Sequence, residues 1–139
     1  MSPGETRAFL LEGTRTAKLA TTRKDGSPHV APIWFLLDED GSIVFTTHAG
    51  SVKGRTLRRD GRVCLSVDDE QPPFAFVIID GTVSISEDPT DLLRWATLIG
   101  GRYMGAARAA EYGARNGVPG ELLVRVTPTR TVAQSGVAS

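Results

Sequence analysis

Residues 46–62, TTHAGSVKGRTLRRDGR, place the start of a predicted helix beside two cations. Ser51 is a typical N-cap residue, so the first helical turn begins at Val52 and contains Lys53, with Arg55 just beyond it. A helix N-terminus carries a partial positive charge, and each cation there costs roughly 0.3–1 kcal/mol. A bound phosphate would offset this cost, because unpaired backbone N–H groups meet at the same place. The alternative is a solvated basic helix face, which the spacing alone allows equally well.

Length and composition limit what this helix start can belong to. The 139 residues suit one domain with its own core, so we expect a single domain over residues 1–139. Basic and acidic residues number 16 each, and the zero net charge predicts no general attraction to nucleic acid or membranes. No apolar run approaches the roughly 20 residues that cross a bilayer, and the N-terminus lacks a signal-peptide core. We therefore expect a soluble, cytoplasmic protein.

Cysteine and histidine are too few for a dedicated metal site. The single cysteine, Cys64, lies in the apolar run VCLSV, where a small buried side chain is the usual explanation. The two histidines, His29 and His48, are separated by a predicted strand and a turn, so no zinc cluster is expected. His29 fits an exposed hairpin position, whereas His48 is close enough to Ser51 for a minor role at an anion site.

Strands and short turns surround the basic helix. The runs TAKLATT (16–22) and HVAPIWFLL (29–37) have strand composition, and Asp25-Gly26 between them is a strong hairpin signal. Four further strands are expected over residues 42–47, 62–67, 74–87 and 121–132. Gly81 predicts a bend or bulge inside the longest of them. No G-x-G-x-x-G lies between a strand and a helix, which disfavours a Rossmann site.

Helices are expected at the periphery of these strands. Ser2, Pro3 and Glu5 form a capping box that opens an N-terminal helix, and Gly13 stands where that helix should end. Residues 89–115 are expected to form one helix broken near Gly100-Gly101, or two short helices. The whole pattern predicts a mainly β fold of the α+β type, a six-stranded antiparallel β-barrel with peripheral helices.

Two of the predicted strands carry apolar residues on both faces, which indicates that the chain forms an oligomer. In residues 29–37 the alternating sets are both apolar, so one face can fill the barrel while the other needs a cover. Residues 74–79 show the same property. Because contiguous exposed apolar surface is usually an interaction site, we expect a homodimer with its interface along these strands.

The order of these segments resembles the split β-barrel of the pyridoxamine-phosphate-oxidase-like flavin and deazaflavin proteins. The similarity extends from AKLATTRKDGSPHVAPIWF (17–35) through IVFTTHAGSVKGRTLRRDGRVCLSV (43–67) to IDGTVSI (79–85). Its most specific part is the pattern T-T…K-x-R-x-L-R-R-D within residues 46–60. In that family the helix start after the third strand binds the cofactor phosphate, which the charge argument indicates from the residues alone.

The resemblance implies a cofactor site made from three segments. The helix start would hold the phosphate, through Ser51, Val52, Lys53 and Arg55. The preceding strand would contact the ribityl chain or the ring, through Thr46 and Thr47. A third segment would lie along one side of the isoalloxazine ring, through Pro32, Ile33 and Trp34. A partner subunit would cover the other side of the ring. Taken alone, Trp34 is explained equally well by core packing. Without the neighbouring helix, strand propensity is the better explanation of the two threonines.

The resemblance also favours one branch of the family. No clear counterpart of the basic C-terminal substrate motif of pyridoxamine-phosphate oxidases follows Leu123, so oxidation of that vitamer is not expected. The compact chain resembles the deazaflavin-using branch of the family, which uses coenzyme F420. Its excess of arginine over lysine is consistent with a high-GC source such as the actinobacteria that make this cofactor. The resemblance implies a reductase that passes a hydride from reduced F420 to an activated double bond of a small planar substrate, with no catalytic acid–base pair.

Three alternatives stay open at this point. FMN shares the ribityl-phosphate geometry of F420, so an FMN-dependent oxidase or reductase is possible within the same fold. A non-catalytic carrier of F420 or flavin would need the same binding residues. A nucleic-acid-binding barrel could use the basic helix against phosphates, although the zero net charge counts against it.

Overall fold

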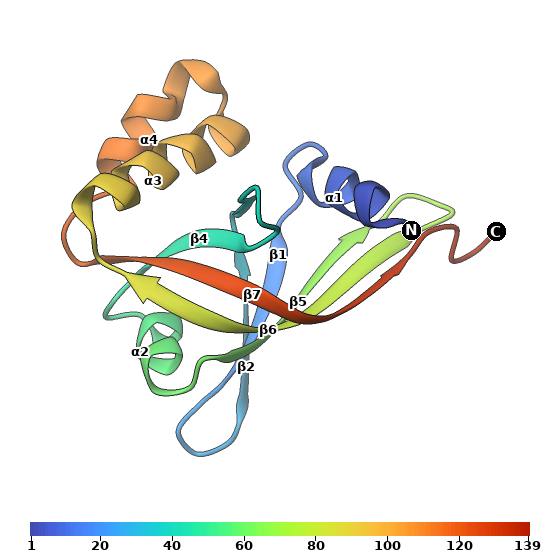
Figure 1. The fold of residues 1–139 in the computed structure, drawn as a ribbon, viewed down its shortest axis with the longest axis horizontal. Helices are drawn as coiled ribbons and strands as arrows, with labels where there is room; N and C mark the ends of the chain where they lie inside the picture. The colour runs from blue at the N-terminus through green and yellow to red at the C-terminus, as the bar shows by residue number, and fades with distance from the viewer.

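The computed structural model describes residues 1–139 as one antiparallel sheet with four α-helices around it (Figure 1). The sheet order is β2-β1-β5-β6-β7-β4-β3. The strands are β1 (Ala17–Thr22), β2 (Pro28–Ile33), β3 (Leu36–Leu37), β4 (Ile43–His48), β5 (Arg62–Asp69), β6 (Ala75–Ser86) and β7 (Glu121–Gln134). The helices are α1 (Pro3–Leu11), α2 (Val52–Arg59), α3 (Pro89–Met104) and α4 (Ala109–Asn116), with a 3₁₀ turn η1 (Ala106–Arg108) before α4.

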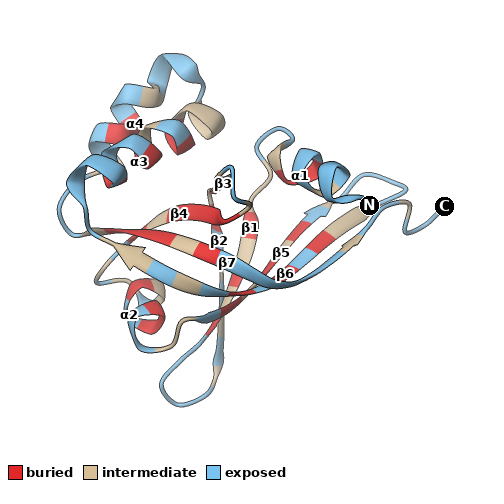
Figure 2. Cartoon of the chain, in the orientation of Figure 1, coloured by how far each residue is buried: buried red, intermediate tan, exposed pale blue.

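The strands curve into a split half-barrel, which confirms the expected mainly β fold. Buried residues gather on the inner faces of the strands and on the inner sides of α2 and α3 (Figure 2). Gly81 marks the expected bulge, because the β6–β7 register shifts between Asp80 and Gly81. A Cβ at Gly81 would lie 2.6 Å from Val126 Cγ1, so only glycine lets β7 approach β6 this closely.

The expected count of six strands is wrong, because the segment 29–37 breaks into β2 and β3. At the break the backbone of Phe35 bonds to side chains of α3 instead of a neighbouring strand. Its N–H donates to Tyr103 Oη at 3.1 Å, and its carbonyl accepts from Arg102 Nη1 at 2.7 Å. These contacts satisfy the polar groups that a continuous strand would place in a ladder.

The helical region after β6 also differs in detail. Two helices are present, as one alternative predicted, but α3 continues through Gly100-Gly101 and stops at Gly105, which has φ +94°. Gly100 serves helix packing, because a Cβ there would lie 2.5 Å from Tyr112 Cβ on α4. Glycine is therefore required where the two helices approach, and the chain turns only where it needs a positive φ.

The capping box at Ser2 and the turn glycines lie where the sequence predicts them. Ser2 Oγ accepts from the Glu5 N–H, and the Glu5 carboxylate accepts from the Ser2 N–H. Cys64 and His29 differ from expectation, since both are half-buried; Cys64 lies on the outer face of β5 and His29 on the inner face of β2. None of the helices is long and apolar enough to cross a bilayer.

Candidate functional site

The start of α2 is built around one hydroxyl group. Ser51 Oγ accepts from the Gly54 N–H at 3.0 Å, donates to the His48 carbonyl at 2.8 Å, and lies 3.2 Å from Thr47 Oγ1. The N-cap predicted at Ser51 is confirmed. This network joins the end of β4 rigidly to the first turn of α2, so the helix axis has a fixed position relative to the sheet.

Two backbone donors remain free at this helix start. The N–H groups of Val52 and Lys53 occupy the first two helical positions and have no intrahelical acceptor. The first turn contains no acidic side chain that could neutralise them. They can therefore donate to an anion, and the helix dipole adds to the attraction.

Gly54 allows α2 to begin this close to the strand that precedes it. A Cβ at this position would lie 2.3 Å from the His48 carbonyl oxygen and 2.9 Å from that of Ala49. Both contacts are with backbone, which cannot rotate away as a side chain could. The site therefore depends on a hydrogen atom in place of a side chain at position 54.

A cavity of about 390 Å³ lies beside this helix start. Its lining contains six of the nine residues that the sequence assigns to a cofactor site: Pro32, Trp34, Thr46, Thr47, Ser51 and Lys53. The other five lining residues come from the end of β4, from α3 and α4, and from the start of β7: His48, Ala96, Ile99, Asn116 and Glu121. Segments that are far apart in the sequence thus meet around one space.

Three of the nine residues lie outside the cavity lining. Ile33 is buried in the main hydrophobic core, and Val52 is 40% exposed. Arg55 is exposed and forms no ion pair. It follows Lys53 by two residues, and residues at that spacing do not face the same side of a helix.

Charges inside the cavity are few. Lys53 is the one permanently charged cation in the lining, and Glu121 is the one carboxylate. Burial raises the pKa of the Glu121 carboxyl above its usual value of 4.5, while the charges of His48 and Lys53 act in the opposite direction. The sequence analysis did not identify Glu121 as a site residue. Glu121 is the first residue of β7, and the β4–β7 register pairs it with His48, which places it beside the helix start.

An aromatic stack supports Trp34 in the wall of this cavity. The Trp34 ring lies parallel to the Tyr103 ring, with centroids 4.9 Å apart and an interplanar angle of 3°. Tyr112 meets the same indole at 53°, with centroids 5.9 Å apart. Tyr103 Oη donates to the Arg15 carbonyl at 2.6 Å, and burial raises the pKa of this phenol. The indole therefore has a firm backing from α3 and α4.

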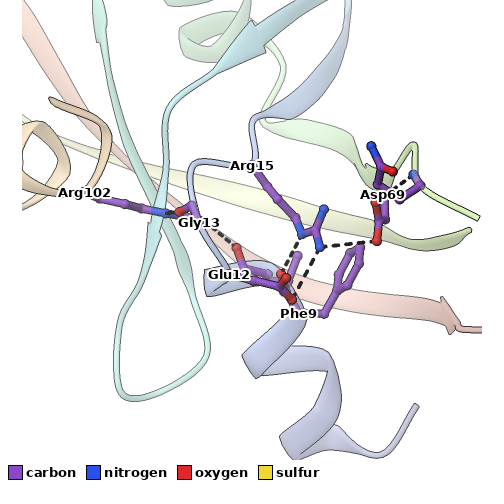
Figure 3. Close-up of polar contacts among 8 residues, drawn as sticks. Phe9, Glu12, Gly13, Arg15, Asp69 and Arg102 are labelled. Carbon is purple, nitrogen blue, oxygen red and sulfur yellow. Dashed lines mark hydrogen bonds and ion pairs between the residues drawn. The ribbon is translucent and has the colours of Figure 1, made fainter. Parts of the chain in front are cut away.

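Arg102 ties this wall to the N-terminal helix. Its guanidinium donates to the carbonyls of Leu10 at 2.7 Å, Gly13 at 3.0 Å and Phe35 at 2.7 Å. Figure 3 shows it reaching Gly13, close to the contacts that Arg15 makes at the end of α1. No carboxylate pairs with Arg102, and burial lowers the pKa of its guanidinium. Three carbonyl dipoles therefore take the place of a counter-ion.

A larger cavity, about 570 Å³, lies under α1 at the other end of the half-barrel. None of the nine predicted residues lines it. Its arginine, Arg7, already donates to the Asp38 carbonyl. The smaller cavity, in contrast, combines free backbone donors with the unpaired side chain of Lys53.

Comparisons with known proteins show the family and the fold. The family model described as Pyridoxamine 5'-phosphate oxidase matches residues 2–135. The conserved hypothetical protein Rv2991 from Mycobacterium tuberculosis is 29% identical with a TM-score of 0.86, over 98% of this chain and 86% of that chain. A protein described as an F420 reductase is 27% identical with a TM-score of 0.71, over 90% of this chain and 94% of that chain. The heme storage protein HutZ from Vibrio cholerae shares the fold at 18% identity and a TM-score of 0.74, over 99% of this chain and 98% of that chain. No curated protein sequence matches this chain.

Proposed function

Because the chain belongs to the pyridoxamine 5'-phosphate oxidase family, we propose that it is an oxidoreductase that uses coenzyme F420. The observation that carries the proposal is a single cavity that joins the helix start at Ser51 and Lys53 to the aromatic wall at Trp34. A cofactor with a phosphate and a flat ring needs an anion site and an apolar surface together. Similarity to the protein described as an F420 reductase supports this choice of cofactor.

The cavity residues divide the work of binding. The N–H groups of Val52 and Lys53, with the Lys53 ammonium, would donate to the phosphate. Thr46 and Thr47 would contact the ribityl chain. Reduced deazaflavin, when bound, supplies the hydride for an activated double bond of a small planar substrate. The chain itself orients both molecules and excludes water from between them.

Pro32 and Trp34 would lie along the ring. Pro32 is exposed at the edge of the sheet, while Trp34 is held from behind by Tyr103. A flat ring needs an apolar surface that does not move, and the stacked indole offers one. No side chain in this wall is required to transfer a proton.

Arg55 favours F420 over FMN. Its guanidinium is exposed and unpaired, and it lies outside the cavity that would hold the phosphate. The acidic glutamyl tail of F420 continues beyond the phosphate and could pair with this arginine, whereas FMN ends at the phosphate. The ion pair would form at the surface, so its contribution is at most about 1 kcal/mol.

Titration of the purified protein with F420 and with FMN tests the cofactor. We expect Lys53→Ala to weaken F420 binding by roughly 10–100-fold, because a hydrogen bond to a charged group contributes about 1.5–3 kcal/mol. Arg55→Ala added to it should weaken binding further. Lys24→Ala, on the exposed hairpin between β1 and β2, is the matched control. Unchanged F420 affinity in the Lys53→Ala, Arg55→Ala double variant would remove the phosphate assignment.

Turnover separates an enzyme from a carrier. Oxidation of reduced F420 should be followed with quinone, nitro-compound and enone acceptors. Turnover with at least one of these classes supports a reductase. Tight binding of F420 without turnover on the whole panel would identify a carrier instead.

A second subunit would complete the site. Val30, Ile78 and Val132 lie on the outer face of the sheet with 61%, 37% and 41% of their surface exposed. Ile78 is the direct cross-strand partner of Val132. We infer that a second copy of the chain covers this face and closes the cofactor cavity.

Sedimentation velocity tests this assembly. The wild-type chain should sediment as a dimer, and Ile78→Lys with Val132→Lys should give a folded monomer with weakened cofactor binding. Leu98→Lys, at an exposed position on α3, should remain dimeric. A monomeric wild-type chain that binds F420 normally would contradict the shared site.

A further inference from the structure

Glu121 lines the candidate cofactor cavity, close enough to Lys53 for the charge of that lysine to act on its carboxyl group. It is the first residue of β7 and the direct cross-strand partner of His48 on β4. The same side chain lines a second, smaller cavity of about 180 Å³ formed by the loop that follows α4. Glu121 therefore lines two spaces, one of which is the cavity beside the helix start.

The charge balance of the candidate cofactor cavity is unusual for an anion site. Lys53 contributes one positive charge and Glu121 one negative charge, and neither forms an ion pair. His48 uses Nδ1 to accept from the Gly50 N–H at 3.0 Å, which leaves Nε2 as its other polar atom. The α3 and α4 residues in the lining, Ala96, Ile99 and Asn116, carry no charge. The permanent charges of the lining thus cancel.

We infer that Glu121 makes this cavity selective for a phosphodiester over a phosphomonoester. The inference rests on the proposed function, because it concerns the phosphate of the cofactor bound there. A monoester such as FMN carries close to two negative charges at neutral pH, since its second pKa is about 6. A diester such as F420 carries only one. The single charge of a diester is matched by Lys53, whereas the second charge of a monoester meets the Glu121 carboxylate with no further cation to balance it.

A matched pair of flavins isolates this effect. FMN and its phosphate methyl ester have the same ring and ribityl chain and differ by one charge at the phosphate. Their dissociation constants should be measured at pH 8 by flavin fluorescence, with F420 as a third ligand. For the wild type we expect the methyl ester to bind on the order of tenfold more tightly than FMN. Glu121→Gln should raise FMN affinity by a similar factor and change methyl ester affinity less than threefold.

Two further variants keep the result interpretable. Glu121→Asp retains the charge and should retain the preference for the diester. Glu39→Gln, on the exposed turn before β4, should leave all affinities unchanged. Equal changes in FMN and methyl ester affinity in Glu121→Gln would show a purely structural role and overturn the inference while the proposed function stands. Failure of F420 and both flavins to bind wild type and Glu121→Gln, with the fold intact by circular dichroism, would overturn both.

Discussion

Replacement of Arg102 is the strongest test of how the aromatic wall is held. Arg102→Ala removes three hydrogen bonds to the carbonyls of Leu10, Gly13 and Phe35. Each hydrogen bond from a charged donor contributes about 1.5–3 kcal/mol when buried, and Arg102 is only half-buried. We therefore expect a loss of roughly 3–5 kcal/mol, a large part of the 5–15 kcal/mol typical of a domain.

Urea denaturation followed by circular dichroism measures this loss, and the melting temperature should fall by roughly 10–20 °C. Arg102→Lys keeps the charge but loses the planar fork, so its loss should be intermediate. Arg94→Ala, an exposed arginine on the same helix, should cost less than about 1 kcal/mol. If Arg102→Ala is no more destabilising than Arg94→Ala, then this contact does not anchor α3.

Three further outcomes follow from the structure. Gly54→Ala should abolish F420 binding and lower the free energy of unfolding by more than about 1 kcal/mol, because the methyl group would clash with the backbone carbonyl oxygen of His48. Wild-type F420 affinity of this variant, measured by titration, would contradict the expectation. Tyr103→Phe should lower the free energy of unfolding, measured by urea denaturation, by about 1–3 kcal/mol. The Phe35 N–H and the Arg15 carbonyl lose their partner, while the ring can still stack on Trp34. An unchanged free energy of unfolding would mean that water replaces the hydroxyl. Hydrogen bonds from Arg62 lower the pKa of Asp60 from 3.8 to about 2. The pair therefore stabilises the fold above about pH 4, and this contribution is lost as the pH falls toward 2. Arg62→Ala should return the pKa of Asp60, followed by NMR, toward 3.8.

Local chemistry determines the parts of this fold that sequence reasoning predicts well. The cap at Ser51, the capping box at Ser2 and the bulge at Gly81 each depend on a few neighbouring residues. The break at Phe35 depends on Arg102 and Tyr103, which are more than 60 residues away in the chain. No pattern within residues 29–37 indicates this break, so the sequence predicts one continuous strand where the structure has β2 and β3.

The candidate site shows the same division. The sequence identifies the helix start and the strand residues beside it, because their spacing and charge are local features. It cannot show that α3 and α4 fold over them and add Asn116 to the lining. That Lys53 and Arg55 both hold the phosphate stays a prediction: only Lys53 lines the cavity, and the two side chains leave the helix in different directions.

Glycine at position 54 has a consequence for how such a site can change over time. The proposed anion cradle at α2 consists mainly of main-chain N–H groups, and any amino acid other than proline provides one. Most side chains around the cradle can therefore be exchanged without loss of the donors themselves. Position 54 is the exception, because every other amino acid would place a carbon atom against the carbonyl oxygen of His48. An engineer who redesigns this pocket can vary Val52 freely but has to leave Gly54 in place.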